Sequence, residues 1–181
     1  MRGAVSRSRR LTTRLVALQL DEIAPPPGAH NASGLRFGAA LAVVDDRDGD
    51  GQAELAIGAP GWDGNGASSS SAVRGAVYIV SSAAGGGGTA LHELRSPASA
   101  LGDALGDEFG RALSSGADWD GNGLPELVVG APAEGSGGAL YILYVTAGAQ
   151  FASTTPGGYA RISAEALGLP SGARLDRKSV V

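Results

Sequence analysis

Two acidic stretches of the chain have the residue types and the spacing to hold a metal ion. Each carries an oxygen-bearing side chain at positions 1, 3, 5 and 9, counted from its first aspartate, with glycine at positions 4 and 6. The candidate ligands of the first stretch are Asp46, Asp48, Asp50, Gln52 and Glu54. Those of the second are Asp118, Asp120, Asn122, Leu124 and Glu126. Position 7 varies in chemistry between the two, so we expect that residue to bind through its backbone carbonyl.

The ligand chemistry favours calcium. A loop that offers only hard oxygen donors suits Ca²⁺, disfavours zinc and copper, and suits Mg²⁺ less well because Mg²⁺ keeps more of its waters. Gly51 and Gly123 allow the sharp turn that lets the chain wrap an ion. The helix–loop–helix calcium motif is excluded, because its position-12 glutamate is replaced by Ile57 and Val129. Solvated acidic turns are the simpler alternative, but two copies with matched spacing favour calcium.

The acidic stretches lie within a longer repeat. Phe37-Gly38 recurs as Phe109-Gly110, and Gly58-Ala59-Pro60 recurs as Gly130-Ala131-Pro132, each 72 residues further on. Apolar residues make up 43% of the chain, and its 30 glycines stand mostly between short apolar runs, which is typical of an all-β protein. A fixed period across several landmarks predicts a repeat architecture.

The repeat predicts four antiparallel strands in each unit, with the acidic stretch as the loop between the first two strands. The strands of the first unit are expected at 37–44, 54–59, 75–82 and 89–95. Those of the second are expected at 109–116, 126–131, 138–146 and 158–164. We further expect Phe37 and Phe109 to pack between units, Tyr78 and Tyr141 to pack in their sheets, and the Gly-Ala-Pro segments to lie next to the acidic loops.

The bulk composition excludes several classes of function. The net charge of −4 offers no basic surface for nucleic acid, and the absence of cysteine excludes disulfides and thiolate metal sites. No apolar run is long enough to span a membrane, so we expect no membrane insertion by this segment. With only His30 and His92 available as imidazole bases, nothing indicates a catalytic site, and we predict that the chain is not an enzyme.

The order Phe-Gly, acidic loop, Gly-Ala-Pro, then Gly-x-Val/Leu-Tyr resembles the FG-GAP repeat of integrin α-subunit N-terminal domains, over residues 37–80 and 109–146. The resemblance implies that each repeat is a four-stranded blade of a β-propeller, and that the ten residues named above bind Ca²⁺. Since typical propellers have ~4–8 blades, the two blades here imply an incomplete propeller. The chain departs from the family pattern at Glu54 and Glu126, where aspartate is commoner, and at Ser171-Gly172, which replaces a third Phe-Gly.

The resemblance leaves two functions open. The leading one is cell adhesion or protein recognition at the cell surface, with structural calcium and a protein ligand or an integrin-β-like partner subunit. The alternative is an accessory propeller module of an extracellular hydrolase, such as a GPI-specific phospholipase D-like enzyme. Because two blades leave apolar faces uncovered, we expect the isolated chain to be marginally stable, aggregated or oligomeric.

The sequence predicts five segments. Residues 1–14 are basic and form either a targeting segment or the start of a fragment, 15–36 hold a flanking strand and a Pro-rich loop, and 37–96 form blade 1. Residues 97–165 form a linker and blade 2, and 166–181 form a truncated third repeat with an anomalous tail. Asn31-Ala32-Ser33 is a glycosylation pattern that applies if the chain is exported.

Overall fold

A computed structural model describes residues 23, 25, 32–63, 74–81, 89–97, 106–146, 150–151 and 158–169. Several predictions lie outside the described residues: the nature of 1–14, the strand before Ile23, the glycosylation pattern at Asn31, and the third-repeat residues Ser171-Gly172 with the tail. The described part of the chain has no helix of the length and apolarity needed to cross a bilayer.

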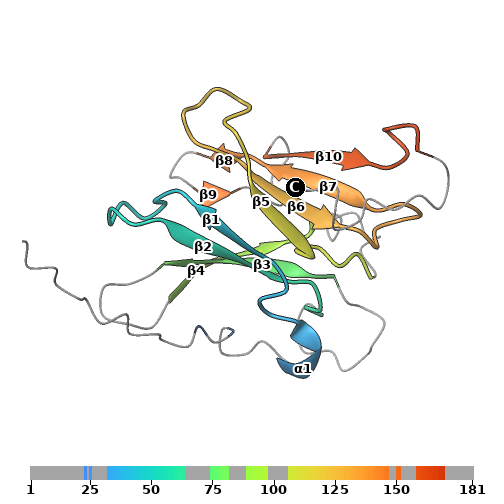
Figure 1. Ribbon diagram of the computed structural model, residues 1–181, viewed down its shortest axis with the longest axis horizontal. Helices are drawn as coiled ribbons and strands as arrows, with labels where there is room; N and C mark the ends of the chain where they lie inside the picture. Colours follow the sequence, from blue (N-terminus) through green and yellow to red (C-terminus); the bar gives the residue numbers. More distant parts are fainter. Residues whose placement is uncertain are drawn as a thin grey trace, which may run out of the picture.

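The first blade is a four-stranded antiparallel sheet in the order β1-β2-β3-β4 (Figure 1). Its strands are β1 (Leu41–Val44), β2 (Glu54–Ala59), β3 (Ala76–Ser81) and β4 (Thr89–Arg95). Register is set by pairs such as Leu41 with Ile57 and Ile57 with Tyr78. Strand β3 is buried along its whole length, because alternate residues face two different apolar clusters.

The second blade repeats this order in the sheet β5-β6-β7-β10. Its strands are β5 (Ala112–Ser115), β6 (Leu127–Ala131), β7 (Ala139–Leu143) and β10 (Tyr159–Ser163). A small hairpin of β8 (Val145–Thr146) and β9 (Gln150–Phe151) stands between β7 and β10. The predicted all-β architecture of antiparallel four-stranded blades is therefore confirmed.

Several expected elements differ from the structure. Residues 37–40 precede β1 as a turn, in which Gly38 has φ of +83° and so cannot continue a strand. Helix α1 (Ala32–Leu35) is a single turn that the sequence analysis missed. The single strand expected at 138–146 ends at Leu143, and the chain then forms β8 and β9, which bring the buried Phe151 into the core.

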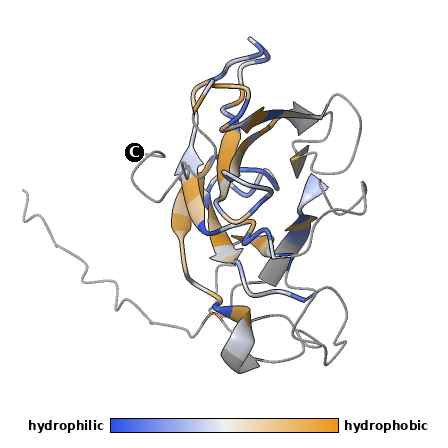
Figure 2. Cartoon of the chain, turned by 90° about the vertical axis from the view of Figure 1, so that its right-hand side faces the viewer, coloured by the Kyte–Doolittle hydropathy of each residue, from blue (hydrophilic) through white to orange (hydrophobic). Residues whose placement is uncertain are grey.

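One apolar cluster joins the two blades. It combines side chains of the first blade, including Val77 and Ile79, with side chains of the second, including Leu127 and Tyr141. Figure 2 shows hydrophobic residues concentrated on the strands and hydrophilic residues in the loops. Phe109 is fully buried in this cluster, with its ring centroid 5.5 Å from that of Tyr141, which confirms its predicted inter-blade position. Phe37 instead packs on Tyr78 of its own blade, at 5.7 Å.

The Phe-Gly and Gly-Ala-Pro segments meet where the blades touch. Within the first blade the backbone nitrogen of Gly38 donates to Gly58 O at 3.0 Å. Across the interface, a Cβ added to Gly58 would overlap the backbone oxygen of Gly110. The two backbones therefore approach as closely as they do because neither residue has a side chain.

This contact corrects one expectation. The acidic loop enters β2 at Glu54, whereas the Gly-Ala-Pro segment ends β2 at Ala59. The segment thus lies at the opposite end of β2 from the acidic loop, and its tight packing serves the blade interface rather than the loop.

The interface glycine provides a prediction with a matched control. Gly58→Ala should lower the free energy of unfolding by about 2 kcal/mol or more, because backbone on both sides must move to admit the methyl group. Gly130 holds the same place in the second blade, but a Cβ there would meet only Ala112, at 3.2 Å to its Cβ. Gly130→Ala should therefore cost much less in urea unfolding of the same chain. Equal losses from the two changes would contradict the proposed role of the glycine contact.

Candidate metal centres

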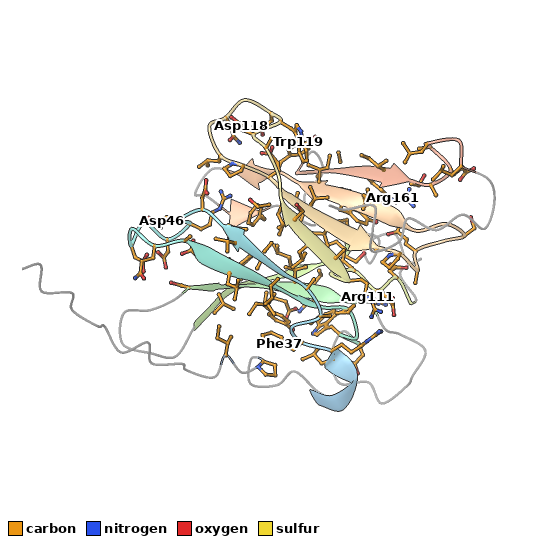
Figure 3. The ribbon with its side chains drawn as sticks, viewed as in Figure 1. Phe37, Asp46, Arg111, Asp118, Trp119 and Arg161 are labelled. Carbon is orange, nitrogen blue, oxygen red and sulfur yellow. The ribbon has the colours of Figure 1, made fainter. Side chains whose placement is uncertain are left out.

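The two acidic loops occupy equivalent places in the two blades. The first joins β1 to β2 and the second joins β5 to β6. Figure 3 shows Asp46 and Asp118 on loops that extend beyond the same end of their sheets. The loops are in direct contact, because the Nη2 atom of Arg47 donates to Pro125 O at 2.8 Å. The site is therefore a pair of adjoining loops rather than two isolated turns.

The first aspartate organises each loop through backbone hydrogen bonds. Asp46 accepts from Gly49 N at 2.6 Å and from Gly51 N at 2.7 Å. Asp118 accepts from the two glycines at the same positions, both at 2.8 Å. Gly51 has φ of +86° and Gly123 has φ of +88°, so the sharp turn expected of both is confirmed. The two sequences thus fold into the same loop conformation.

The last acidic residue of each loop is buried and only half satisfied. Glu54 and Glu126 are each 1% exposed. The Oε2 atom of Glu54 accepts from Arg47 N, and that of Glu126 accepts from Trp119 N at 2.5 Å. In both residues Oε1 is buried and has no hydrogen-bond partner among the described residues. Such an oxygen costs about 1–3 kcal/mol or more if nothing binds it.

A third buried carboxylate shows what full satisfaction looks like in the same fold. Glu134 is also buried, but one of its oxygens accepts from the Tyr141 hydroxyl at 2.7 Å and the other from Arg161 Nε at 2.6 Å. Burial alone therefore does not leave a carboxylate oxygen unpaired in this chain. The unpaired oxygens of Glu54 and Glu126 lie where each acidic loop meets its strand.

The carboxylates of each loop lie close together. In the first loop Asp46, Asp48, Asp50 and Glu54 offer ligand atoms that all lie within 4.8 Å of one another, and in the second Asp118, Asp120 and Glu126 do the same. These residues fit a divalent cation of oxygen preference, which would give each glutamate Oε1 its missing partner. The structure therefore brings together all the predicted acidic ligands of each loop.

The remaining predicted ligands differ in what the structure shows. Asn122 follows the acidic pattern, since its Oδ1 accepts from Leu124 N at 2.8 Å, as Asp50 Oδ1 accepts from Gln52 N at 2.8 Å. Coordination by the backbone carbonyls of Gln52 and Leu124 stays a prediction. Asp45 lies outside the cluster, as expected for a residue that has alanine as its counterpart in the second repeat.

Without a metal ion, the electrostatic environment of the first loop disfavours the ionised form of Glu54. Burial is the main cause that raises the pKa of Glu54 above its ordinary value. The neighbouring charges of Asp48, Asp46 and Asp50 raise the pKa further, and the hydrogen bond from Arg47 N lowers it. The folded loop thus destabilises the very carboxylate that closes the cluster.

Position 2 of the loops has an environment that the sequence does not predict. Arg47 is 5% exposed, and its guanidinium lies 4.5 Å from the ring centroid of Phe151, which belongs to the second blade. Trp119, at the same position of the second loop, is 53% exposed. A charged residue inside an acidic loop reads as solvated, so only the distant residues Pro125 and Phe151 reveal that Arg47 is buried.

Comparison with known proteins places these units in a family. Residues 37–80 and 109–143 match the protein-family model of the FG-GAP repeat. Human integrin alpha-X is 42% identical over 96 residues, which is 53% of this chain and 8% of the relative. Integrin alpha-PS5 of Drosophila melanogaster is 39% identical over 102 residues, or 56% of this chain and 9% of the relative. Human integrin alpha-D is 43% identical over 96 residues, or 53% and 8%.

The matched stretches are thus FG-GAP repeats, and the resemblance drawn from the motifs is confirmed. The chain aligns with less than a tenth of the length of these relatives. Both acidic loops fall inside the matched repeats. The repeats carry the candidate metal centres as integral parts of their first hairpins.

The raised pKa of Glu54 predicts that removing its charge stabilises the metal-free chain. In the metal-free chain at pH 7, Glu54→Gln should increase stability, because it removes a buried charge that burial and three aspartates disfavour. As the pH falls through the pKa of folded Glu54, the wild-type carboxyl takes up a proton and its stability should approach that of the variant. Chelator-treated chains unfolded in urea at several pH values test this.

Asp45→Asn is the control, because Asp45 adjoins the loop but lies outside the carboxylate cluster. It should leave the pH dependence that is due to Glu54 in place. A metal-free Glu54→Gln chain that is less stable than wild type at pH 7 would contradict the electrostatic description of the loop.

Proposed function

Because the chain carries two FG-GAP repeats whose loops each end in a half-satisfied buried glutamate, we propose that it is a calcium-binding, non-catalytic propeller segment of an adhesion or protein-recognition molecule. Calcium has a structural role in this proposal. It binds the carboxylates of each loop, completes the coordination of Glu54 and Glu126, and fixes the loop to the start of β2 or β6.

The main observation that supports calcium binding is the unpaired Oε1 atom of Glu54 and of Glu126. A buried carboxylate oxygen without a hydrogen bond is costly, and each glutamate belongs to a cluster of carboxylates whose ligand atoms lie within 4.8 Å of one another. A proton could neutralise one carboxyl group, but a Ca²⁺ ion at ~2.3–2.6 Å from several oxygens would compensate the whole cluster at once. Two loops with the same unpaired atom make a shared ligand the simplest explanation.

The proposed recognition role follows from the family rather than from the loops themselves. The relatives matched above are named as integrin α subunits. We extend to this chain a place at the cell surface and a protein partner, either a ligand or a β-like subunit. Rigid calcium loops would then serve to hold the blades that present a recognition surface made by other parts of the protein.

Calcium should stabilise the chain through both loops. Tenfold excess of free calcium over the dissociation constant adds about 1.4 kcal/mol per site, so the melting temperature should rise on addition of CaCl₂ and fall with chelator. The first loop offers four carboxylates and the second three. Asp48→Ala should therefore remove more of the calcium-dependent stabilisation than Asp120→Ala, because affinity follows ligand charge.

Terbium offers a site-resolved readout of the same prediction. Trp119 lies within the second loop, whereas the first loop contains no tryptophan. Terbium luminescence excited through tryptophan should therefore fall with Asp120→Ala and persist with Asp48→Ala. Loss of that signal from the first-loop variant alone would contradict the assignment of the sites.

The cell-surface role requires the full-length protein. An antibody against this segment should stain intact cells, and staining should be weaker for Glu54→Gln/Glu126→Gln because the blades are less stable without calcium. Staining that requires permeabilised cells would contradict the proposed location. Normal surface staining together with unchanged adhesion of the variant cells in calcium medium would contradict the proposed structural role of the ion.

A further inference from the structure

We propose that Arg47 couples the two metal loops, so that calcium in the first loop strengthens calcium binding in the second. This inference rests on the proposed function, because it assumes that both loops bind calcium. Arg47 acts as a positioning residue. Its side chain donates to the carbonyl oxygen of Pro125 and not to a carboxylate oxygen of either loop, so it occupies no metal ligand.

The contacts of Arg47 run from one loop to the other. Its backbone nitrogen donates to Glu54 Oε2, which closes the first loop. Its Nη2 atom donates to Pro125 O at 2.8 Å, one residue before Glu126, which closes the second. A single residue thus contacts the closing glutamate of one site and the backbone that carries the closing glutamate of the other.

The geometry leaves the second site free to bind. Arg47 bonds a carbonyl oxygen of Pro125 rather than a carboxylate oxygen, so Glu126 Oε1 keeps no partner among the described residues. Trp119 N holds the other oxygen of Glu126 at 2.5 Å. Arg47 therefore fixes the chain before Glu126 without competing with an ion for the ligand atom.

The buried position of Arg47 restricts its side chain to few alternative contacts. Burial lowers the pKa of the guanidinium, while the charges of Asp45, Glu54 and Glu126 oppose that shift. The guanidinium also rests on the Phe151 ring at 4.5 Å. A side chain enclosed in this way has few alternative positions, so ordering its backbone also orders the hydrogen bond at Pro125.

The coupling follows from loop order. Calcium bound by Asp46, Asp48, Asp50 and Glu54 would hold Arg47 N against Glu54. The guanidinium would then hold Pro125 in the position that aims Glu126 at its cluster, so the second ion would meet a loop that is already ordered. By reciprocity, calcium in the second loop should strengthen binding in the first by the same factor.

Calorimetric titration of four chains tests this: wild type, Asp48→Ala, Arg47→Met and the double variant. Arg47→Met keeps the backbone nitrogen that bonds Glu54 and an unbranched apolar side chain, but it loses the guanidinium that rests on Phe151 and donates to Pro125. Loss of the first site should weaken the second by about fivefold or more when Arg47 is present. In the Arg47→Met background the same loss should change the second site by less than about twofold.

Arg36→Met is the matched control. The Nη2 atom of Arg36 pairs with Glu108 Oε1 at 2.8 Å, so this residue also joins the two blades but touches neither loop. Arg36→Met should leave the coupling unchanged. Equal weakening of the second site with and without Arg47, or no weakening in either background, would overturn the coupling while leaving calcium binding in place. No calcium heat in any chain would instead overturn the proposed function.

A second measurement avoids altering Arg47. In the Asp120→Ala chain only the first loop can bind well, and calcium should slow hydrogen exchange at the backbone amides of residues 121–124 and of Glu126. Exchange that is unchanged there, while it slows in the first loop, would overturn the proposal even if Arg47→Met fails to fold.

Discussion

A buried carboxylate with one unpaired oxygen is the constraint on which the rest of this structure depends. Glu54 and Glu126 stand where an exposed acidic loop becomes a buried strand, so each is enclosed by its sheet and surrounded by other carboxylates. In each glutamate a backbone N–H donates to Oε2, while Oε1 is buried without a hydrogen-bond partner among the described residues. Glu134 shows that the same fold pairs both oxygens of a carboxylate that has no such loop beside it. In the proposed function a cation neutralises this cluster, and without it the charges of Asp48, Asp46 and Asp50 disfavour the ionised form of buried Glu54.

The blades are joined by two different kinds of contact at their two ends. At one end, Gly58 and Gly110 bring two backbones together where any side chain would collide, which gives the Phe-Gly and Gly-Ala-Pro segments a shared physical purpose. At the other end, Arg47 reaches from the first loop to Pro125 and Phe151. The apolar cluster between the sheets fills the space between these ends. The equivalents that would face a neighbour outside this pair are open: Gly38 has nothing near its missing Cβ, and Trp119 is largely exposed. The described part of the structure thus contains one complete interface between blades. Gly38 and Trp119 lie on the surfaces that would form the equivalent interfaces with further blades.

The sequence predicts correctly those features that depend on residues close together in the chain. Strands β2 and β4 begin and end as expected, because turn residues bound their apolar runs. The acidic side chains of each loop lie together as expected, and the glycines at fixed spacing adopt the positive φ that the turn requires. The sequence does not predict those features that depend on a residue far away in the chain. The first strand starts late because Gly38 bonds back to Gly58, β7 ends early because Phe151 must enter the core, and Gly-Ala-Pro lies far from the loop because its partner is Gly110 in the other blade. Arg47 could not be distinguished from a solvated arginine, since its contacts lie about seventy residues or more along the chain.

The most direct measurement is a crystal structure of the protein grown with calcium. We expect one ion in each acidic loop, bonded to Oε1 of Glu54 and to Oε1 of Glu126 at ~2.3–2.6 Å, together with the aspartates of the same loop. Loops without ions at millimolar calcium, with those two oxygens bonded to water or to protein donors instead, would contradict it.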